Sequence, residues 1–129
     1  MRKCNFYLMN QKNQVEIERK FIVKKLPQNL DKYSSEDIEQ KYLTSPENEV
    51  EIRLRRKGDK YFQTTKKGNG KSRLETETEI SENKFKQLEV SALGRKIEKK
   101  RYSIPYGSET IELDIYKGDL TGLTVAEVE

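Results

Sequence analysis

Glu16, Glu18 and Lys20 place two carboxylates and an ammonium group at alternate positions of a segment rich in β-branched and aromatic residues, 15–23. Such a segment predicts a strand, in which alternate side chains share one face about 7 Å apart. Carboxylates bind hard divalent cations and ammonium groups bind phosphate oxygens, so this face has the chemistry of a metal and phosphate site. For one strand alone, a solvent-exposed surface explains the charges better. Whether these charges form a site or a solvent-exposed surface therefore depends on the pattern in the other strand-like segments.

The same alternation recurs in most of the other strand-like segments. In residues 49–57, Arg53 and Arg55 share one face, while Ile52 and Leu54 lie on the opposite one. Carboxylates and basic residues are segregated into different segments, whereas a solvated face would mix them as cross-strand pairs. The charged faces predicted in this way comprise Glu51, Arg53, Arg55, Lys57, Arg73, Glu75, Glu77, Glu79, Lys99, Arg101, Glu112, Asp114, Glu127 and Glu129.

The elements that must position these side chains are mostly strands joined by glycine-containing turns. We predict eight strands, over residues 15–23, 40–43, 49–57, 60–67, 72–80, 97–104, 110–116 and 123–129. Ser81 has the character of an N-cap for a helix whose apolar face carries Phe85 and Leu88. Ser34, with Asp37 three residues later, predicts a short helical turn before the second strand.

Together these elements predict a mainly β fold of the α+β type. We expect an eight-stranded antiparallel closed β-barrel, a tunnel with a charged interior and one or two flanking helices. An open sheet with its charged face in water is the alternative. Closure is favoured because it removes exposed sheet edges. In addition, one helix and a short helical turn would cover little of a flat apolar sheet, whereas they can pack on part of a barrel.

Composition limits what such an interior can bind. The 129 residues suit one domain, and the 26 basic residues are interspersed with 22 acidic ones, which argues against nucleic acid as a partner. Cys4 is the only cysteine and histidine is absent, so any metal needs oxygen ligands. The single cysteine fits a reducing cytoplasm, and no apolar run is long enough to cross a membrane.

The combination of converging cations and clustered carboxylates predicts a compact polyanion that carries a divalent metal. Arginine and lysine recognise phosphate oxygens, and carboxylates hold Mg²⁺ or Mn²⁺. A nucleoside triphosphate or inorganic triphosphate satisfies both requirements. The sequence contains no GxxxxGK[ST] motif, so the site is not of the P-loop type.

The motif ExExK, here Glu16-Ile17-Glu18-Arg19-Lys20, resembles the signature of the CYTH superfamily, the triphosphate tunnel metalloenzymes. Other segments follow in the order of that family, so the resemblance covers residues 16–129. These segments are Arg53-Leu54-Arg55, the strand ending at Lys66, Arg73-Leu74-Glu75-Thr76-Glu77, Lys99-Lys100-Arg101-Tyr102, Glu112-Leu113-Asp114 and Val125-Ala126-Glu127-Val128-Glu129.

The resemblance implies a role for most of the predicted lining. It implies that Mg²⁺ or Mn²⁺ is the cofactor. In the mechanism that we expect from it, a second metal or the Glu127 carboxylate orients the attacking water, and Lys20 is a candidate base. The implied metal ligands are Glu16, Glu18, Glu127 and Glu129, with Glu75, Glu77 and Asp114 in supporting positions. The implied triphosphate-binding residues are Lys20, Arg53, Arg55, Lys66, Arg73, Lys99 and Arg101.

The activity that follows is a metal-dependent hydrolysis of triphosphates, with inorganic tripolyphosphate as the expected substrate and nucleoside triphosphates as further ones. A class IV adenylyl cyclase is an alternative, although no sequence feature reads a purine. Thiamine triphosphatase is a further family activity, which the absence of tryptophan disfavours. A non-catalytic polyphosphate- or nucleotide-binding module is the alternative from another class.

The two ends of the chain carry further expectations. We expect residues 1–14 to form a flexible leader and residues 15–129 to form the tunnel domain. Family members usually continue into helices after the last strand, whereas this chain ends at Glu129, so we expect those helices to be missing. Either the chain is shortened or a second protomer, in a homodimer, supplies cover, and both alternatives leave the activity of this form open.

Overall fold

The computed structural model of the protein describes residues 3–8, 11–17, 19–68 and 72–128, with side chains for residues 19–68 and 73–128. The main helix is α1 (Glu82–Glu89), and two short 3₁₀ helices are η1 (Leu30–Lys32) and η2 (Gly118–Leu120). The strands are β1 (Lys3–Leu8), β2 (Gln11–Ile17), β3 (Arg19–Ile22), β4 (Ser34–Tyr42), β5 (Val50–Lys57), β6 (Lys60–Lys67), β7 (Ser72–Ile80), β8 (Leu93–Tyr106), β9 (Glu109–Lys117) and β10 (Thr124–Val128).

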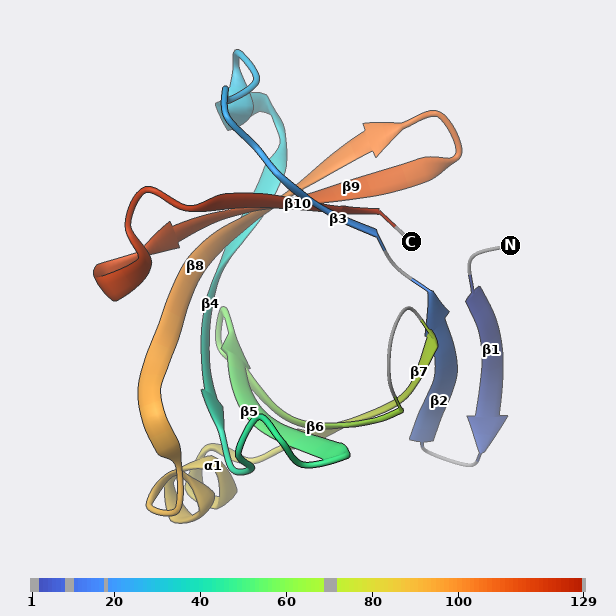
Figure 1. Cartoon of the computed structure of the whole chain (residues 1–129), viewed down its shortest axis with the longest axis vertical. Coiled ribbons are helices and arrows are strands. Elements are labelled where there is room, and N and C mark those ends of the chain that lie inside the picture. Colours follow the sequence, from blue (N-terminus) through green and yellow to red (C-terminus); the bar gives the residue numbers. More distant parts are fainter. Residues whose placement is uncertain (1–2, 9–10, 18, 69–71, 129) are drawn as a thin grey trace.

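All ten strands belong to one antiparallel sheet, in the order β1-β2-β7-β6-β5-β4-β8-β9-β10-β3. The sheet curls around a central axis, so that β5 and β6 face β3 and β10 across its concave side (Figure 1). The tunnel-like curvature predicted from the sequence is therefore present, and it turns one face of nearly every strand toward a shared interior.

The predicted closure of this sheet is wrong, because the first predicted strand is divided between two partners. Its first half, β2, pairs with β7, and its second half, β3, pairs with β10. β1 pairs with β2 on the edge away from β7, and closure would need β3 to pair with this end of the order. Within the described residues, the strand order therefore ends at β1 and β3 instead of closing on itself.

Two further expectations concern the region before β5. The helical turn predicted at Ser34 is wrong: residues 34–42 form one continuous strand that pairs with β5 and β8. Ladder hydrogen bonds to two neighbours outweigh the local preference of serine and aspartate for a helix start. The expected leader, residues 1–14, contains β1 and the first part of β2, and its flexibility stays a prediction.

The helix predicted after Ser81 is confirmed. The Ser81 hydroxyl accepts a hydrogen bond from the backbone N–H of Lys84 at 3.1 Å, as expected of an N-cap. Phe85 packs on Tyr61 of β6 with ring centroids 4.9 Å apart, and α1 contacts the convex side of β5 and β6. Phe85 of the helix and Leu54 of β5 are both buried, so apolar residues form the core near α1.

Charged side chains occupy the concave face, as predicted. Asp114 is 0% exposed and Lys99 is 4% exposed, whereas few apolar residues reach comparable burial. A buried charge is tolerated only when it is paired or when a ligand neutralises it. The interior therefore requires partners for its charges. Within the part of the chain that the structure describes, no helix is long and apolar enough to cross a membrane.

Candidate functional site

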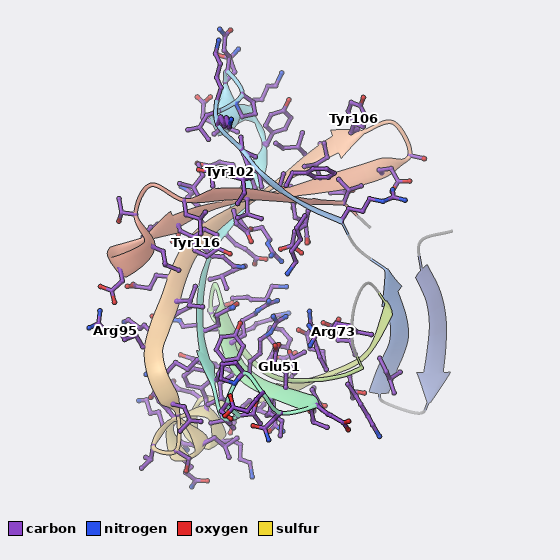
Figure 2. All side chains as sticks on the ribbon, viewed as in Figure 1. Glu51, Arg73, Arg95, Tyr102, Tyr106 and Tyr116 are labelled. Carbon is purple, nitrogen blue, oxygen red and sulfur yellow. The ribbon has the colours of Figure 1, made fainter. Side chains whose placement is uncertain are left out.

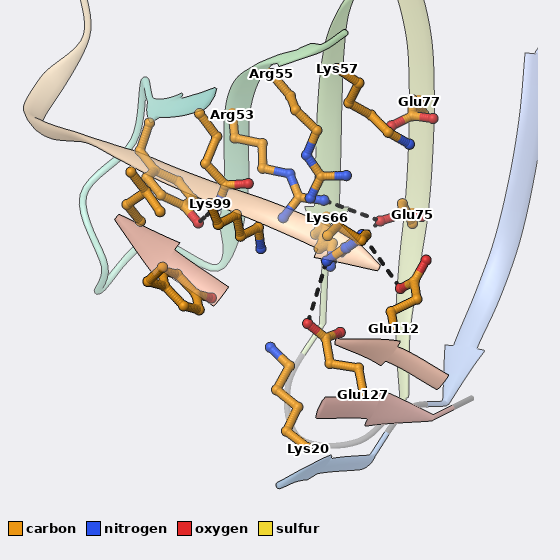
Figure 3. Close-up of a pocket in the computed structure, with 15 residues that line it drawn as sticks. Lys20, Arg53, Arg55, Lys57, Lys66, Glu75, Glu77, Lys99, Glu112 and Glu127 are labelled. Atoms are coloured by element: carbon orange, nitrogen blue, oxygen red, sulfur yellow. Dashed lines mark hydrogen bonds and ion pairs between the residues drawn. The ribbon is translucent and has the colours of Figure 1, made fainter. Parts of the chain in front are cut away.

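The concave face of the sheet holds a cavity of about 240 Å³ whose wall is almost entirely polar. Side chains from β3 to β10 converge on it, and Figure 3 shows them pointing toward one another from opposite sides. Because side chains alternate along each strand, every second residue of a strand contributes to the wall. The lining residues are Lys20, Gln40, Tyr42, Arg53, Arg55, Lys57, Lys66, Glu75, Glu77, Ile97, Lys99, Arg101, Glu112, Tyr116 and Glu127.

A fully buried carboxylate, Asp114 on β9, organises one side of the cavity. Arg101 donates two hydrogen bonds to it, from Nε to Oδ1 at 2.7 Å and from Nη2 to Oδ2 at 2.9 Å. Lys99 Nζ lies 2.7 Å from Oδ2 of the same carboxylate. Burial alone would raise the pKa of Asp114, but the hydrogen bonds and charges of Arg101 and Lys99 hold that pKa below its usual value. Both oxygens of Asp114 are thus engaged by cations.

Arg101 also lies close to two carboxylates of the cavity wall. Its Nη1 atom is 3.4 Å from Glu112, and its Nη2 atom is 3.6 Å from Glu127. Burial would lower the pKa of Arg101, but the hydrogen bond to Asp114 and the charge of Glu112 raise it above the ordinary value. Arg101 therefore serves as the permanent cation of an ion-pair network that ties β8, β9 and β10 together.

Other cations in the cavity are less well compensated. Burial, together with the charges of Arg53 and Arg101, lowers the pKa of Arg55 to about 10. Burial likewise lowers the pKa of Lys99 to about 8, although Asp114 opposes the shift. The Nε atoms of Arg53 and Arg55 are buried without a hydrogen-bond partner among the described residues. A polyanion in the cavity would supply the missing negative charge.

Two carboxylates on β7, Glu75 and Glu77, balance part of the positive charge that β5 and β6 bring to the cavity. Glu75 lies 3.5 Å from Lys66 Nζ and 3.9 Å from Arg53 Nη2, and Glu77 accepts a hydrogen bond from the Thr64 hydroxyl at 3.3 Å. In this part of the wall, basic side chains therefore lie next to acidic ones, as Arg53 and Lys66 lie next to Glu75. The arrangement suits an elongated anion with phosphate groups at several positions.

The sequence model of the CYTH domain matches residues 14–129. The chain belongs to the CYTH family. An inorganic triphosphatase of Nitrosomonas europaea is 41% identical over 116 residues, which cover 88% of this chain and 75% of that protein.

Two solved structures have a similar fold. The crystal structure of an inorganic triphosphatase superimposes with a TM-score of 0.63 at 37% identity, covering 88% of this chain and 71% of that one. A putative adenylate cyclase from Bacillus halodurans superimposes with a TM-score of 0.66, covering 91% of this chain and 81% of that one. At 18% identity, the second likeness concerns the fold alone.

Most of the cations predicted for a CYTH site come together in the cavity. Lys20, Arg53, Arg55, Lys66, Lys99 and Arg101 line it. Arg73 does not line it: its Nη2 atom is 3.8 Å from Glu51, and both residues line a neighbouring cavity of about 440 Å³. Figure 2 shows Arg73 and Glu51 on the inner side of the curved sheet, far from Tyr106 at the tip of the β8–β9 hairpin.

The predicted metal ligands fall mainly where the structure gives no side chains. Glu16 is described only by its backbone in β2, and Glu18 and Glu129 lie outside the described residues. Glu127 does line the cavity, opposite Lys20 in the β10–β3 ladder and opposite Glu112 in the β10–β9 ladder. Among the described residues, no group of three or more acidic, cysteine or histidine side chains is arranged to hold a metal.

The donors that are described nevertheless fit a hard cation. Glu112 and Glu127 lie directly opposite each other on neighbouring strands, and both face the cavity. Like charges in this position repel one another unless a cation lies nearby, and carboxylate oxygens are the ligands that Mg²⁺ and Mn²⁺ prefer. Arg101 supplies part of that positive charge.

Sequence reasoning missed four residues of the cavity wall: Gln40, Tyr42, Ile97 and Tyr116. Lys57 and Glu112 were placed on the charged faces of their strands but given no role. Gln40 and Tyr42 could have been found by extending the alternation rule to residues 40–43, since both lie on the same face of β4. The predicted lining was based on charged residues, and Gln40 and Tyr42 are neutral.

Proposed function

We propose that the protein is a divalent-metal-dependent hydrolase of triphosphates, with inorganic tripolyphosphate as its main substrate. The observation that carries the proposal is the cavity of about 240 Å³, in which the buried Nε donors of Arg53 and Arg55 have no hydrogen-bond partner among the described residues. An extended anion with several phosphate groups would pair them. The 41% identity to an inorganic triphosphatase supports the same substrate.

The basic side chains would bind the phosphate chain and stabilise the transferring group. Arg53 and Arg55 are on the same face of β5, so their guanidinium groups can hold oxygens of neighbouring phosphates. Lys66 and Lys99 approach from the flanking walls. Fixed cations of this kind stabilise charge that spreads over the phosphoryl oxygens in the transition state without reorganising during the reaction. We keep Arg73 as a phosphate-binding candidate at the neighbouring cavity.

We assign the reacting water to the wall formed by Glu127 and Lys20. These residues are Cα partners across β10 and β3, and both face the cavity. The Glu127 carboxylate would orient the water for in-line attack on a terminal phosphorus, and Lys20 is our candidate for accepting its proton.

The cofactor in this proposal is Mg²⁺ or Mn²⁺. Glu127 with Glu16, Glu18 and Glu129 would hold it, with Glu75 and Glu77 in support, and it would neutralise phosphate charge and polarise the phosphoryl oxygens. Asp114 fits a different role, because Arg101 and Lys99 engage both of its oxygens. We therefore propose that Asp114 positions these two cations.

The cyclase alternative is disfavoured by the lining of the cavity. A cyclase has to hold a purine while the 3′-hydroxyl attacks the α-phosphorus, and in the described cavity wall only Ile97, Tyr42 and Tyr116 offer apolar surface among the charged side chains. We also propose a cytoplasmic location, on the basis of the single cysteine, and no nucleic acid partner. A homodimer stays a prediction.

The test is to incubate the purified protein with tripolyphosphate, ATP or thiamine triphosphate, each with Mg²⁺ or Mn²⁺. We expect the fastest release of phosphate from tripolyphosphate and no cyclic AMP from ATP. Formation of cyclic AMP would favour the cyclase. Tight binding of tripolyphosphate without phosphate release under any metal condition would favour a binding module.

A further inference from the structure

The cavity wall contains a short neutral stretch among its charges. Gln40 and Tyr42 are two residues apart on β4 and both line the cavity. In the strand ladders, Gln40 lies between Arg55 of β5 and Ile97 of β8. The neutral pair is therefore located beside a cation of the proposed phosphate site, and any phosphate bound by Arg55 would come close to it.

The hydrogen bond within this pair determines what Tyr42 can do. Gln40 Nε2 donates to the Tyr42 hydroxyl oxygen at 2.9 Å. A phenol has one hydrogen, and an amide nitrogen can only donate, so the hydrogen of Tyr42 must point to another acceptor. Among the described residues, the structure gives that hydrogen no acceptor. Phosphate oxygens in the cavity are acceptors of the required kind.

The stability of the fold does not explain a glutamine at position 40. The side chain is only 4% exposed, and its Oε1 atom is buried without a hydrogen-bond partner in the described structure. A buried polar atom without a partner destabilises a fold, whereas an apolar side chain of similar length would avoid this penalty. Residues that violate a local rule in this way are expected at functional sites.

We infer that Gln40 is a positioning residue, which keeps the Tyr42 hydroxyl oriented as a hydrogen-bond donor to the bound triphosphate. The inference rests on the proposed function, because it assumes that a triphosphate occupies the cavity. Gln40 itself acts only through Tyr42. The amide donates to one lone pair of the phenol oxygen, so the phenol hydrogen points away from Gln40 and is available to the substrate.

A double-mutant cycle tests this role. We expect Tyr42→Phe and Gln40→Met each to lower kcat/KM for tripolyphosphate roughly tenfold or somewhat less, the effect of about one hydrogen bond. In the Tyr42→Phe background, Gln40→Met should have no further effect, because its target is gone. The melting temperature of Gln40→Met should stay equal to that of the wild type or rise. Gln63→Met, on the face of β6 that points away from the cavity, is the matched control and should leave kcat/KM unchanged.

The same cycle should be measured on the affinity for tripolyphosphate in EDTA, which separates the two proposals. If the wild-type protein binds tripolyphosphate but does not hydrolyse it, the proposed reaction is refuted. The role of Gln40 can then still be tested, because the affinities of the four proteins for tripolyphosphate can be compared. Equal losses from Gln40→Met in both backgrounds, or no loss in either, would overturn the inference. A wild-type protein that neither binds nor hydrolyses tripolyphosphate would overturn both proposals.

Discussion

Arg101 and Asp114 form a two-pronged ion pair between neighbouring strands, with Nε–Oδ1 and Nη2–Oδ2 distances of 2.7 and 2.9 Å. The two residues are Cα partners in the β8–β9 ladder, so the backbone register alone brings them side by side. Asp114 also lies 2.7 Å from Lys99 Nζ. One carboxylate thus supports both the fold and the cation arrangement of the cavity.

Replacing Asp114 with asparagine should destabilise the protein strongly. The change leaves Arg101 and Lys99 as buried cations without their carboxylate, which typically costs about 3–5 kcal/mol of unfolding free energy. Urea denaturation measures the effect. Asp37→Asn is the matched control, because Asp37 pairs with Lys117 at 2.9 Å on the exposed surface, where a pair contributes less than about 1 kcal/mol. Equal losses in the two variants would contradict the structural role of Asp114.

The affinity for tripolyphosphate should fall as the pH rises through about 8. Burial lowers the pKa of Lys99 to about 8 in the free protein, so its positive charge is present below that pH and is lost above it. An anion binds better to the charged form, and the affinity can fall by up to roughly tenfold per pH unit above the pKa. Titration calorimetry in EDTA between pH 7 and 9.5 measures this dependence.

The control for this pH dependence is Lys99→Arg, which keeps its charge throughout the range. The slope of affinity against pH should be shallower in this variant than in the wild type, since any remaining slope then comes from other groups. An unchanged slope would assign the titration to a group other than Lys99.

Arg55→Met should weaken tripolyphosphate binding while leaving the fold intact. A hydrogen-bonded guanidinium contributes about 1.5–3 kcal/mol to anion binding, which corresponds to a loss of roughly 10- to 100-fold. Because Arg55 is buried among other cations, an apolar replacement should not lower the melting temperature much. Arg56→Met is the matched control, since the exposed Arg56 donates to the carbonyl oxygen of Gly58 and faces the other side of the sheet. A comparable loss of affinity in the control would refute the assignment.

Removing the divalent metal should abolish phosphate release, and Glu127→Gln should raise the metal concentration needed for half-maximal rate. We expect a rise of at least roughly tenfold, because the variant lacks a charged oxygen ligand. The measurement is a Mg²⁺ titration of the initial rate after treatment with EDTA. Glu98→Gln on the outer face of β8 should leave the titration unchanged. A normal metal requirement in Glu127→Gln would remove Glu127 from the metal site.

Sequence patterns predicted those features that depend on a single strand or helix. The alternation in residues 49–57 correctly placed Arg53 and Arg55 on one face, because side chains of an extended backbone point to opposite sides whatever their neighbours are. The helix after Ser81 was equally predictable, since its N-cap hydrogen bond joins residues three positions apart. The helical turn predicted at Ser34 was wrong, because that segment pairs with strands from two other parts of the chain.

The amino-acid sequence by itself determined which residues can face a common interior and that this interior would be charged. Only the tertiary structure decided which charges meet: Asp114 was predicted to support a metal, yet its oxygens are engaged by Arg101 and Lys99. It also decided that the first predicted strand is divided between β7 and β10, which leaves the sheet open. The physical reason is that alternation is a local property of each strand, whereas pairing, burial and desolvation depend on which strands become neighbours.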